Sequence, residues 1–330
     1  MSLPKISIVT PSYNQGKYLS RTLTSVREQD YPDMEHFVID GGSTDDTISI
    51  LKKVKGLTGW VSESDNGQSH AINKGLAKTT GDILTWLNSD DQLVEGTLEP
   101  IARLFKENPE LDLVYGNCLM LHESGAEKLS KPDADSQKLL GGMSFAQPAS
   151  FFSRRILEKY GGSLRQDLHY GMDYDFFLFV ALEGNVRYLD QTLAKYLFHP
   201  ASKSTQFQAR FAEDYAKTLQ KLLLSVETGT VWLHKLTSAG FLPEKETEDR
   251  YQFSRKIKSE EIEYAVLENI LSQIKFYYAG LELREARKRL EWLKAEAPDF
   301  FFADPQLPET LRRTRMLPAG LIRIYRKWKG

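Results

Sequence analysis

The sequence predicts an α/β protein with a mostly parallel sheet flanked by helices and a helical C-terminal extension. Two observations support this prediction. In the first half of the 330 residues, short apolar runs alternate with segments whose apolar residues recur three or four positions apart, which is the pattern of strands alternating with amphipathic helices. After about residue 205 the short runs give way to long amphipathic patterns. We therefore predict an α/β domain over 1–205 and a mainly helical region over 206–330.

The first strands and helices follow in order from the N-terminus. The run KISIVTPSYN is rich in β-formers and ends in turn residues, and KYLSRTLTSVREQ follows with apolar residues at helical spacing. The run EHFVID and its Gly-rich turn repeat the pattern, and the next helix is expected to begin at an N-cap at Ser43 or Thr44. A third strand is predicted over 59–62, a helix from Gln68, and a fourth strand in the run DILTWL.

Polar turns follow each of these four strands, over 10–14, 40–46, 62–68 and 88–91. The carboxyl ends of parallel strands meet at one edge of a sheet, and in open α/β sheets ligands bind outside that edge. Four polar strand ends at one edge therefore predict a cleft, and this cleft is where we expect the functional site.

The second half mixes strands and helices before it becomes helical. We predict a strand over 112–122, a strand and a helix over 146–162, an aromatic-rich helix over 172–184, and two closing strands over 186–200. Beyond the boundary near 205, amphipathic patterns predict long helices over 207–226 and 257–297.

The composition excludes several classes of protein. With 43 Lys and Arg against 45 Asp and Glu, the net charge of -2 gives no general reason to expect nucleic-acid binding. The one cysteine, Cys118, cannot form an internal disulfide, which fits a reducing cytosolic compartment. No apolar run approaches the roughly 18–20 residues that span a bilayer, and the first residues lack the pattern of a signal peptide. We expect a cytoplasmic protein.

The fourth strand ends in two adjacent carboxylates, in the stretch WLNSDD at 86–91. Adjacent side chains on a strand point to opposite faces, so both can serve one site only if the chain turns there. One carboxylate can then bind a hard divalent cation, with phosphate oxygens completing its shell, while the other accepts hydrogen bonds from a sugar hydroxyl. The alternative is an Asp-rich turn that caps the helix near 96–106, because Asp is common in turns.

The stretch VIDGGSTDDT carries a second set of candidates. Gly41 and Gly42 permit positive φ angles and close approach of a ligand to the backbone. Asp40 and Ser43 can hydrogen-bond a base or a ribose. A plain turn that caps the next helix accounts for the same residues, because the stretch lacks the G-x-G-x-x-G fingerprint of dinucleotide-binding proteins.

Two further stretches carry titratable residues near element ends. Asp173 and Asp175 precede a very apolar helix in GMDYDFFLFV. Either could be the N-cap of that helix, and Asp173 could instead lie in the cleft as a partly desolvated base. His199 ends a strand before a Ser- and Lys-rich turn that could contact phosphate, although a lone histidine is more often structural than a ligand.

Taken in order, these stretches resemble glycosyltransferase family 2, whose members have the GT-A fold, a Rossmann-like nucleotide-sugar-binding sheet. The resemblance lies in ISIVTPSYNQGKYLSRTLTSVREQDYP, VIDGGSTDDT, ESDNGQSHAINKG, GDILTWLNSDD, QPASFFSRRILEKYGG, GMDYDFFLFVALEG and FHPASKS, which together span residues 4–205. It implies that 1–205 is the catalytic domain of an inverting, hexosyltransferase-type enzyme. Such an enzyme moves a sugar from a nucleotide-diphosphate donor to an acceptor hydroxyl, here in bacterial surface polysaccharide or glycoconjugate synthesis.

The resemblance also implies roles for individual residues. Asp173 matches the general base that takes the proton from the acceptor hydroxyl. Asp91 matches the ligand of a divalent cation, Mn²⁺ or Mg²⁺, with Asp90 in the ribose or metal shell and His199 as a further candidate ligand. The donor nucleotide, expected to be UDP, is implied to bind at Thr10, Pro11, Tyr13, Asp40, Gly41, Asp65, Gln68, Asn88 and Asp90.

Three residues depart from the pattern of the family. Gly41 stands where many members have a second Asp that reads the base, so it puts uracil specificity in question. Asn88 stands where an Asp often opens the acidic motif, which lowers the cation affinity that we expect. His70 stands on a predicted helix where relatives carry Asp.

The last 20 residues, 311–330, interleave seven basic residues with apolar and aromatic ones and contain no acid. This pattern fits a segment that docks on an anionic membrane, and it equally fits a solvated tail. Docking would suit a glycan or lipid-linked glycan acceptor and a position at the inner face of the cell membrane. The long helices after 205 offer surfaces for a homo-oligomer. The competing function from another class is a non-catalytic nucleotide-sugar or glycan-binding module, which would bind nucleotide without turnover.

Overall fold

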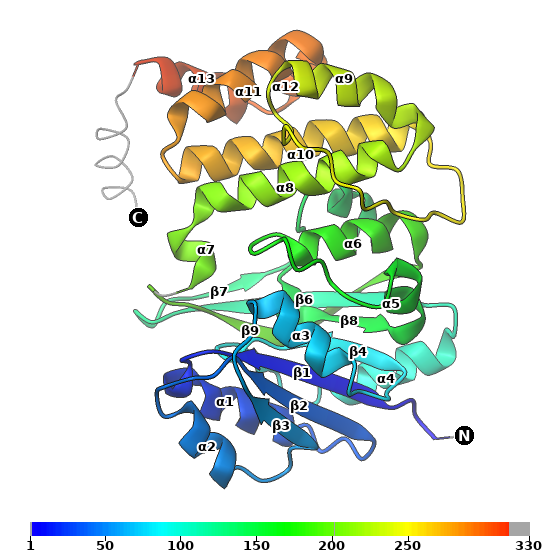
Figure 1. Ribbon diagram of the computed structural model, residues 1–330, viewed down its shortest axis with the longest axis vertical. Helices are drawn as coiled ribbons and strands as arrows, with labels where there is room; N and C mark the ends of the chain where they lie inside the picture. Colours follow the sequence, from blue (N-terminus) through cyan, green and yellow to red (C-terminus); the bar gives the residue numbers. More distant parts are fainter. Residues whose placement is uncertain (1, 201, 317–330) are drawn as a thin grey trace. The chain divides into compact units, whose positions relative to one another are not determined.

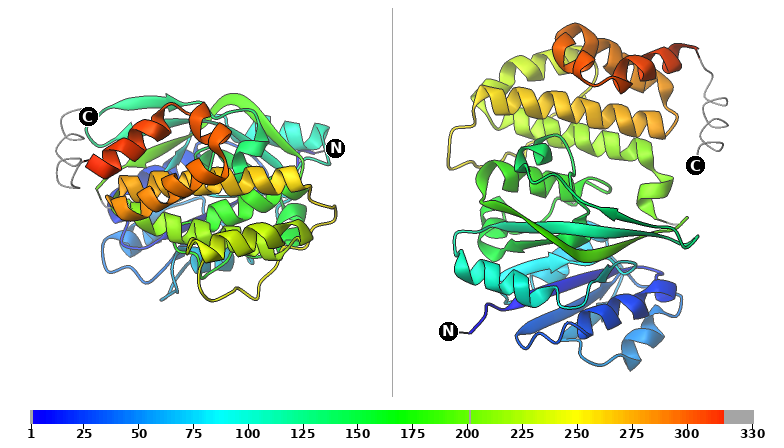
Figure 2. Two further views of the ribbon diagram at one scale, coloured as in Figure 1. Left: turned by 90° about the horizontal axis from the view of Figure 1, so that it is seen from above. Right: turned by 180° about the vertical axis from the view of Figure 1, so that it is seen from behind.

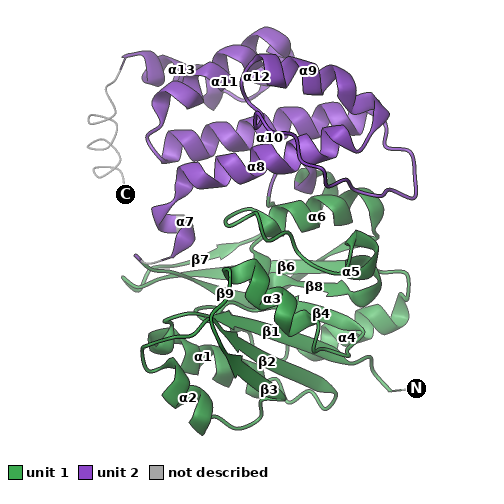
Figure 3. Cartoon of the chain, in the orientation of Figure 1, with its two compact units in different colours: residues 1–138, 143–199 green, residues 139–142, 200–330 purple. Residues whose placement is uncertain are grey.

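The computed structural model describes residues 2–200 and 202–316 of the chain (Figure 1). The chain divides into two compact units (Figure 3). The first comprises Met1–Lys138 and Met143–His199, and the second comprises Leu139–Gly142 and Pro200–Gly330. The chain therefore enters the second unit for four residues, returns to the first, and crosses again after His199.

The first unit is built on a mixed sheet. Nine strands of the described chain form this sheet in the order β3-β2-β1-β4-β8-β6-β9-β5, with β7 paired to β6. The strands are β1 (Ile6–Ser12), β2 (Met34–Asp40), β3 (Gly59–Ser62), β4 (Ile83–Trp86), β5 (Gln92–Leu93), β6 (Leu113–His122), β7 (Glu127–Ser130), β8 (Ser150–Ser153) and β9 (Val186–Phe198). The pairs β3–β2, β2–β1 and β1–β4 are parallel. The predicted α/β class with helices around a central sheet is confirmed.

Helices of the first unit cover the parallel strands on both faces. They are α1 (Gly16–Arg27), α2 (Thr47–Lys53), α3 (Gln68–Leu76), α4 (Leu98–Glu107), α5 (Arg154–Tyr160) and α6 (Met172–Glu183). Val38 of β2 packs in one cluster with residues of α1 and α2, whereas Gly75 of α3 lies against Ile39. Because neighbouring residues of a strand point to opposite faces, α3 lies on the face opposite α1 and α2.

Three predicted elements differ from the observed ones. Residues 186–200, predicted as two strands, form the single strand β9, whose pairing with β6 shifts register around Asn117. The helix after β2 begins at Thr47 with Asp46 at its N-cap, so the prediction of an N-cap at Ser43 or Thr44 is wrong. The segment 257–297 is two helices, because Leu281 adopts a φ of 65° and ends the first of them.

The second unit is helical in its described part. It contains α7 (Lys203–Gln206), α8 (Gln208–Leu224), α9 (Thr230–Ser238), α10 (Ser259–Ala279), α11 (Leu283–Glu296), α12 (Pro298–Ala303) and α13 (Gln306–Met316), with short 3-10 turns at Glu227–Gly229 and at Ser136–Leu140, the latter at the segment shared with the first unit. The long helices α8 and α10 lie side by side in all three views (Figure 2). None of the described helices combines the length and apolar character that a bilayer-spanning helix needs.

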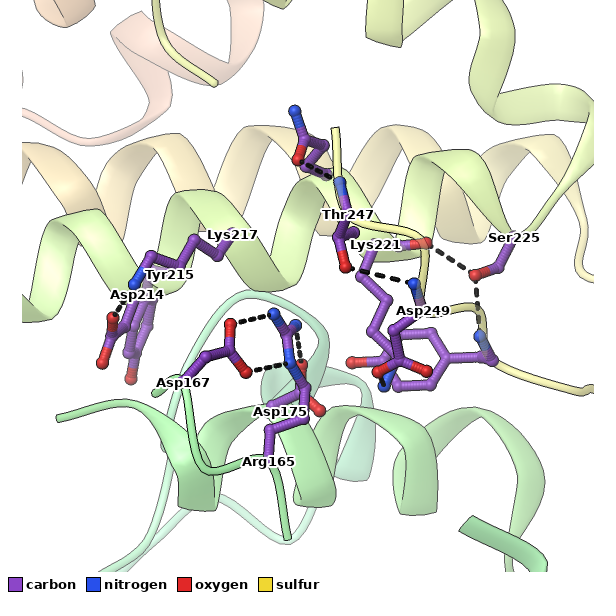
Figure 4. A network of polar contacts seen from close by, with 12 residues as sticks. Arg165, Asp167, Asp175, Asp214, Tyr215, Lys217, Lys221, Ser225, Thr247 and Asp249 are labelled. Carbon is purple, nitrogen blue, oxygen red and sulfur yellow. Dashed lines mark hydrogen bonds and ion pairs between the residues drawn. The ribbon is translucent and has the colours of Figure 1, made fainter. Parts of the chain in front are cut away.

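Buried polar groups also hold the second unit together. The guanidinium of Arg289 on α11 lies 4.5 Å from the ring centres of Phe241 and Tyr277, and its Nε donates to Gln273 Oε1 at 2.8 Å. On α8, the ammonium of Lys221 pairs with Asp249 (Figure 4). A buried cation is tolerated only where it is paired and hydrogen-bonded, so these contacts stabilise helix packing and are not a site.

Candidate functional site

The carboxyl ends of the parallel strands lie at one edge of the sheet, as predicted. Ser12 of β1, Asp40 of β2 and Ser62 of β3 are partners in the strand register. Beyond β4, the N–H of Leu87 donates to the carbonyl of Val9 at 2.9 Å, which keeps the chain on β1 as far as the next turn. The polar residues after all four strands are therefore presented at one edge.

Asp40 organises the turn after β2. Its carboxylate is fully buried and accepts hydrogen bonds from the backbone N–H groups of Gly42 and Ser43 at 3.1 and 2.9 Å. The hydroxyls of Ser43 and Ser62 also donate to it. Gly42 has a φ of 84°, a value that favours glycine. The turn fixes the backbone of Gly41 at the edge of the sheet, and Asp40 supports that backbone.

Asp65 lies against Gly41. A Cβ added to Gly41 would lie 2.8 Å from Oδ2 of Asp65. The other oxygen of Asp65 accepts the N–H of Gly67 at 2.8 Å, so the carboxylate is held in a fixed direction. The space that a side chain at position 41 would need is thus occupied by the carboxylate of Asp65.

The first strand ends in residues of very different exposure. Thr10 is fully buried, and its hydroxyl pairs with Nε2 of His36 at 2.9 Å. Burial lowers the pKa of His36 to about 3, so its imidazole is neutral at pH 7. Pro11 is buried as well, whereas Tyr13 is 61% exposed. Among these three predicted residues, Tyr13 has an exposed side chain, whereas Thr10 and Pro11 are buried.

The turn after β4 is connected to α3 through Asn88. The side-chain amide of Gln68, the first residue of α3, donates to Oδ1 of Asn88 at 2.7 Å. The amide of Asn88 in turn donates to Oδ2 of Asp91 at 3.2 Å. Asn88 therefore links the N-terminus of α3 to the acidic pair.

The two adjacent carboxylates of this turn have different surroundings. Asp91 is 1% exposed, and its Oδ1 accepts the N–H of Leu197 at 3.2 Å. Burial, reinforced by the negative charge of Asp90, raises the pKa of Asp91 well above its ordinary value, although the hydrogen bonds from Leu197 and Asn88 act in the opposite direction. The side chain of Asp90 is 20% exposed, and its Oδ2 lies 2.9 Å from Nε2 of His199.

The alternative in which this turn only caps a helix does not match the contacts. Helix α4 has Thr97 at its N-cap and no side-chain cap hydrogen bond.

Within residues 2–200 and 202–316, no group of three or more Asp, Glu, His or Cys side chains is arranged to hold a metal ion. Asp90 and His199 could supply at most part of a coordination shell, which is how Mg²⁺ and Mn²⁺ are usually held where substrate phosphates complete the shell.

Asp173 and Asp175 both lie in the first turn of α6, and neither is its N-cap, which is Gly171. Asp175 is fully buried, and its carboxylate accepts the hydroxyl of Tyr160 and Nη1 of Arg165, the latter at 3.1 Å. Arg165 also donates to both oxygens of Asp167 (Figure 4). Asp175 is thus a structural carboxylate, whereas Asp173 is partly exposed and its Oδ1 accepts the N–H of the next residue, Tyr174, at 2.8 Å.

His70 occupies the position at which the sequence departs from its relatives. Its Nδ1 accepts the N–H of Asn66 at 3.0 Å, which places the ring proton on Nε2 in the neutral form. His70 therefore fixes the backbone of Asn66, the residue next to Asp65.

Comparisons with known proteins bear on the family and the fold of this chain. Residues 7–161 match the family described as Glycosyl transferase family 2. An uncharacterized glycosyltransferase of Mycobacterium tuberculosis is 35% identical over 190 residues, which are 55% of this chain and 70% of that protein. The chain belongs to glycosyltransferase family 2. The prediction made from its motifs is confirmed, and the protein is a glycosyltransferase.

One further relative and two solved structures extend the comparison. The GalNAc(5)-diNAcBac-PP-undecaprenol beta-1,3-glucosyltransferase of Campylobacter jejuni is 31% identical over 134 residues, 38% of this chain and 42% of that protein. The crystal structure of S. aureus TarS 1-349 with UDP-GlcNAc has a TM-score of 0.59 at 19% identity and covers 94% of this chain and 91% of that one. Mannosyltransferase PcManGT from Pyrobaculum calidifontis, with GDP-Man and Mn²⁺, has a TM-score of 0.55 at 18% identity over 99% and 84%. At these identities the two structures establish the GT-A fold of this glycosyltransferase.

Three residues of this glycosyltransferase were missed by the sequence reasoning. Two of them, Ser69 and Asn73, donate hydrogen bonds to the segment that precedes α6. The third, Arg165, lies on that segment and donates to Asp175 of α6. Ser69 and Asn73 stand inside the quoted motif ESDNGQSHAINKG, which was the available signal. Their partners are 99 and 91 residues away in the sequence, so the motif alone could not name them.

Proposed function

We propose that this glycosyltransferase is an inverting, metal-dependent enzyme that moves a sugar from a nucleotide-diphosphate donor to an acceptor hydroxyl. The observation that carries the proposal is the clustering of Asp40, Asp65, Asn88 and Asp90 at the carboxyl edge of the parallel strands. This edge is where ligands bind in sheets of this kind. Helix α3 begins at the same edge, and Ser69 in its first turn contacts the segment that leads to Asp173.

Asp173 has the features that a general base needs. It is a carboxylate in the first turn of α6, and its side chain is partly exposed, so a ligand can reach its oxygens. In the proposed step it takes the proton of the acceptor hydroxyl while that oxygen attacks the anomeric carbon. The bond from the anomeric carbon to the diphosphate oxygen breaks, and the nucleoside diphosphate leaves with the bonding electrons. Configuration at the anomeric carbon inverts, because attack and departure occur on opposite faces.

We propose Asp90 as the carboxylate that binds the divalent cation, with His199 beside it. This revises the expectation that Asp91 is the ligand. Asp91 is buried and uses both oxygens in hydrogen bonds to Leu197 and Asn88, whereas Asp90 reaches the surface. When bound, a Mn²⁺ or Mg²⁺ ion would offset the negative charge that develops on the leaving diphosphate. Asp91 then acts as a support that fixes the turn on β9.

We propose that Asp65 contacts the donor base in place of the missing acid at position 41. The carboxylate of Asp65 fills the space beside the Gly41 backbone, so the pocket keeps an acidic hydrogen-bond acceptor there. An acceptor suits the N3–H group of uracil, which favours UDP. The 61% exposed ring of Tyr13 provides a surface for stacking. TarS was solved with UDP-GlcNAc, in line with this choice, whereas PcManGT was solved with GDP-Man.

We propose a glycan or lipid-linked glycan as the acceptor and the inner face of the cell membrane as the place of action. The Campylobacter relative acts on an undecaprenol-linked glycan by its name. Of the basic segment 311–330, only residues up to Met316 lie within the described part of the chain. There, Lys294, Arg312 and Arg315 line a cavity of about 290 Å³ together with Phe301, Phe302, Pro308, Leu311 and Met316. Cationic and apolar side chains around one opening suit an anionic lipid surface.

The membrane part of the proposal is tested by co-sedimentation. The full chain and a chain truncated after residue 310 are mixed with vesicles that contain anionic lipid. We expect the full chain to pellet with them and the truncated chain to stay in solution, and we expect high salt to release the full chain. Equal pelleting of the two chains would contradict the proposal of membrane docking and leave the catalytic proposal intact.

The catalytic proposal is tested by Asp173→Asn. The amide keeps the size of the carboxylate and can still accept the N–H of Tyr174, but it cannot take a proton. We expect UDP binding and thermal stability to be unchanged and transfer to fall by roughly 10²–10⁴-fold. A non-catalytic binding module predicts instead that the wild-type protein binds nucleotide and releases no UDP from any sugar donor. Unchanged turnover in the variant would reject Asp173 as the base.

A further inference from the structure

The side chain of Asn73 on α3 holds the start of the segment 163–171, which connects α5 to α6. Nδ2 of Asn73 donates to the carbonyl oxygen of Leu164 at 2.8 Å. Oδ1 of the same amide accepts the N–H of Leu164, also at 2.8 Å. The side-chain amide of Asn73 therefore satisfies both the N–H and the carbonyl of Leu164, as the backbone of a neighbouring strand would. Leu164 is buried, with 2% of its surface exposed, so its backbone groups need hydrogen-bond partners within the protein.

Two further contacts fix the same segment. The hydroxyl of Ser69 donates to the carbonyl of Leu168 at 3.2 Å. Near the middle of the segment, Arg165 bridges Asp167 to Asp175 in the first turn of α6 (Figure 4). The segment is thus fastened to α3 at Leu164 and Leu168 and to α6 through Arg165. A displacement of the segment would move the first turn of α6, which carries Asp173.

Helix α3 is a rigid reference for this attachment. Gly75 lies so close to the sheet that an added Cβ would be 2.3 Å from Cγ1 of Val9. The backbone of the helix at Gly75 therefore lies directly on the side chain of Val9 in β1. At its other end, Gln68 donates to Asn88 beside the acidic pair. The position of α3 is set by the sheet and by the contact of Gln68 with Asn88, and Asn73 transmits this position to the segment before α6.

We propose that Asn73 is a positioning residue that sets the place of Asp173 relative to the donor. The inference rests on the proposed function of Asp173. The position needs one side chain that donates and accepts at the same time, which an amide does and a carboxylate or methyl group does not. Without the two hydrogen bonds from Asn73 to Leu164, α3 stays on the sheet and the residues that contact the nucleotide-sugar donor stay in place. The first turn of α6, which carries Asp173, shifts. Displacements of about 1 Å reduce the rate of a catalysed step by about 10²-fold.

The test compares Asn73→Ala and Asn73→Asp with the matched control Asn108→Ala. The amide of Asn108 at the end of α4 donates to the backbone carbonyl of Leu104 at 2.9 Å, so the control also deletes a side-chain bond to backbone, away from the cleft. The probes are UDP for binding, by calorimetry with Mn²⁺, and UDP-GlcNAc, UDP-glucose and GDP-mannose for turnover. Turnover is release of nucleoside diphosphate with water as the acceptor, from the donor that the wild-type protein hydrolyses fastest, and rates are referred to folded protein.

We expect Asn73→Ala to lower kcat by about 10²-fold and to leave the Kd of UDP within about threefold. Asn73→Asp keeps the acceptor for the N–H of Leu164 and loses the donor, so its kcat should lie between those of wild type and Asn73→Ala. Asn108→Ala should lose stability without loss of kcat. This split between kcat and Kd is not expected of a residue that only stabilises the fold.

Several outcomes would overturn the inference. If both variants at Asn73 keep the kcat of wild type, or if UDP affinity falls as far as kcat, Asn73 does not position the base. If Asn73→Ala does not fold, Asn73→Asp decides by the same criteria. A wild-type protein that hydrolyses none of the three donors overturns the proposed function together with this inference, whereas an active wild type with fully active variants overturns the inference alone.

Discussion

The seating of α3 on the sheet yields the most direct prediction about the fold of the site. The change is Gly75→Ala, made in the wild-type chain and in Val9→Ala. In the wild type the new methyl group would lie 2.3 Å from Cγ1 and 2.9 Å from Cγ2 of Val9, and 3.2 Å from Cγ1 of Ile39. Val9 is fully buried, and its branched side chain has few alternative rotamers. The helix must therefore move away from β1.

The magnitude follows from two opposing effects. Overpacking of a buried position costs about 1–3 kcal/mol, and the short contact to a stiff valine places Gly75→Ala toward the upper end. Replacing a helical glycine by alanine gains about 1 kcal/mol. We expect a net loss of about 2 kcal/mol in the wild-type background. In Val9→Ala the two closest atoms are absent, so the same change should be neutral or stabilising by up to about 1 kcal/mol.

The assay is urea denaturation of the four proteins, followed by circular dichroism, with UDP affinity measured in parallel. The double-mutant cycle isolates the contact, and we expect a coupling free energy of about 2–3 kcal/mol between the two positions. UDP affinity should fall for Gly75→Ala alone and recover in the double variant, because α3 carries Gln68 at the donor side. Additive losses in the cycle would refute the argument that Val9 and Gly75 are in direct contact.

Three further predictions concern His36 within β2, Gly41 after it, and the acidic pair after β4. Burial lowers the pKa of His36 to about 3, so below pH 6.5 the unfolded chain takes up a proton that the folded chain does not. The free energy of unfolding should therefore fall with decreasing pH between 6.5 and 3, by up to about 1.4 kcal/mol per pH unit. In His36→Gln the urea midpoint should fall less steeply over the same range. Gly41→Asp places a second carboxylate beside Asp65, so UDP affinity in calorimetry should drop by about tenfold or more, and an unchanged affinity would move the base elsewhere. Asp90→Ala should abolish the Mn²⁺ dependence of UDP binding, because the side chain of Asp90 reaches the surface. Asp91→Asn should retain this dependence, because Asp91 is buried and its oxygens accept hydrogen bonds from Leu197 and Asn88. The opposite result would restore Asp91 as the ligand.

The sequence predicts the parallel part of the sheet well, because β1, β2 and β4 are short apolar runs bounded by turn residues. The sequence does not predict where an unusual backbone conformation ends a helix or where a register shift lets a strand continue. Leu281 ends α10 with a positive φ, which a leucine does not signal. In β9 a register shift lets one strand continue through polar residues that resemble a turn. Such features depend on tertiary contacts that no local pattern records.

The candidate site is predictable to the level of its strand ends but not of individual atoms. Asp40, Asp65 and Asn88 follow strands and can be named from the sequence alone. Which of two adjacent carboxylates reaches the surface cannot, because the choice depends on Leu197, which is 106 residues from Asp91. The role of Asn73 is hidden for the same reason, since its partner Leu164 is 91 residues away. Sequence patterns locate the edge of the sheet at which the site lies, and contacts between distant segments determine which residue has which role there.

The acidic pair also has a thermodynamic consequence within the proposed function. Asp91 is buried and both of its oxygens accept hydrogen bonds within the protein, and asparagine stands at position 88, so Asp90 is the carboxylate of this turn that a cation can reach. One carboxylate and His199 bind a divalent cation weakly, and the donor diphosphate must then complete the shell. Binding of cation and donor is therefore coupled, and by linkage each raises the affinity of the other by the same factor. If Asp90 binds the cation as proposed, the asparagine at position 88 makes cation binding depend on the donor, and we expect Mn²⁺ to bind tightly only together with the nucleotide-diphosphate sugar.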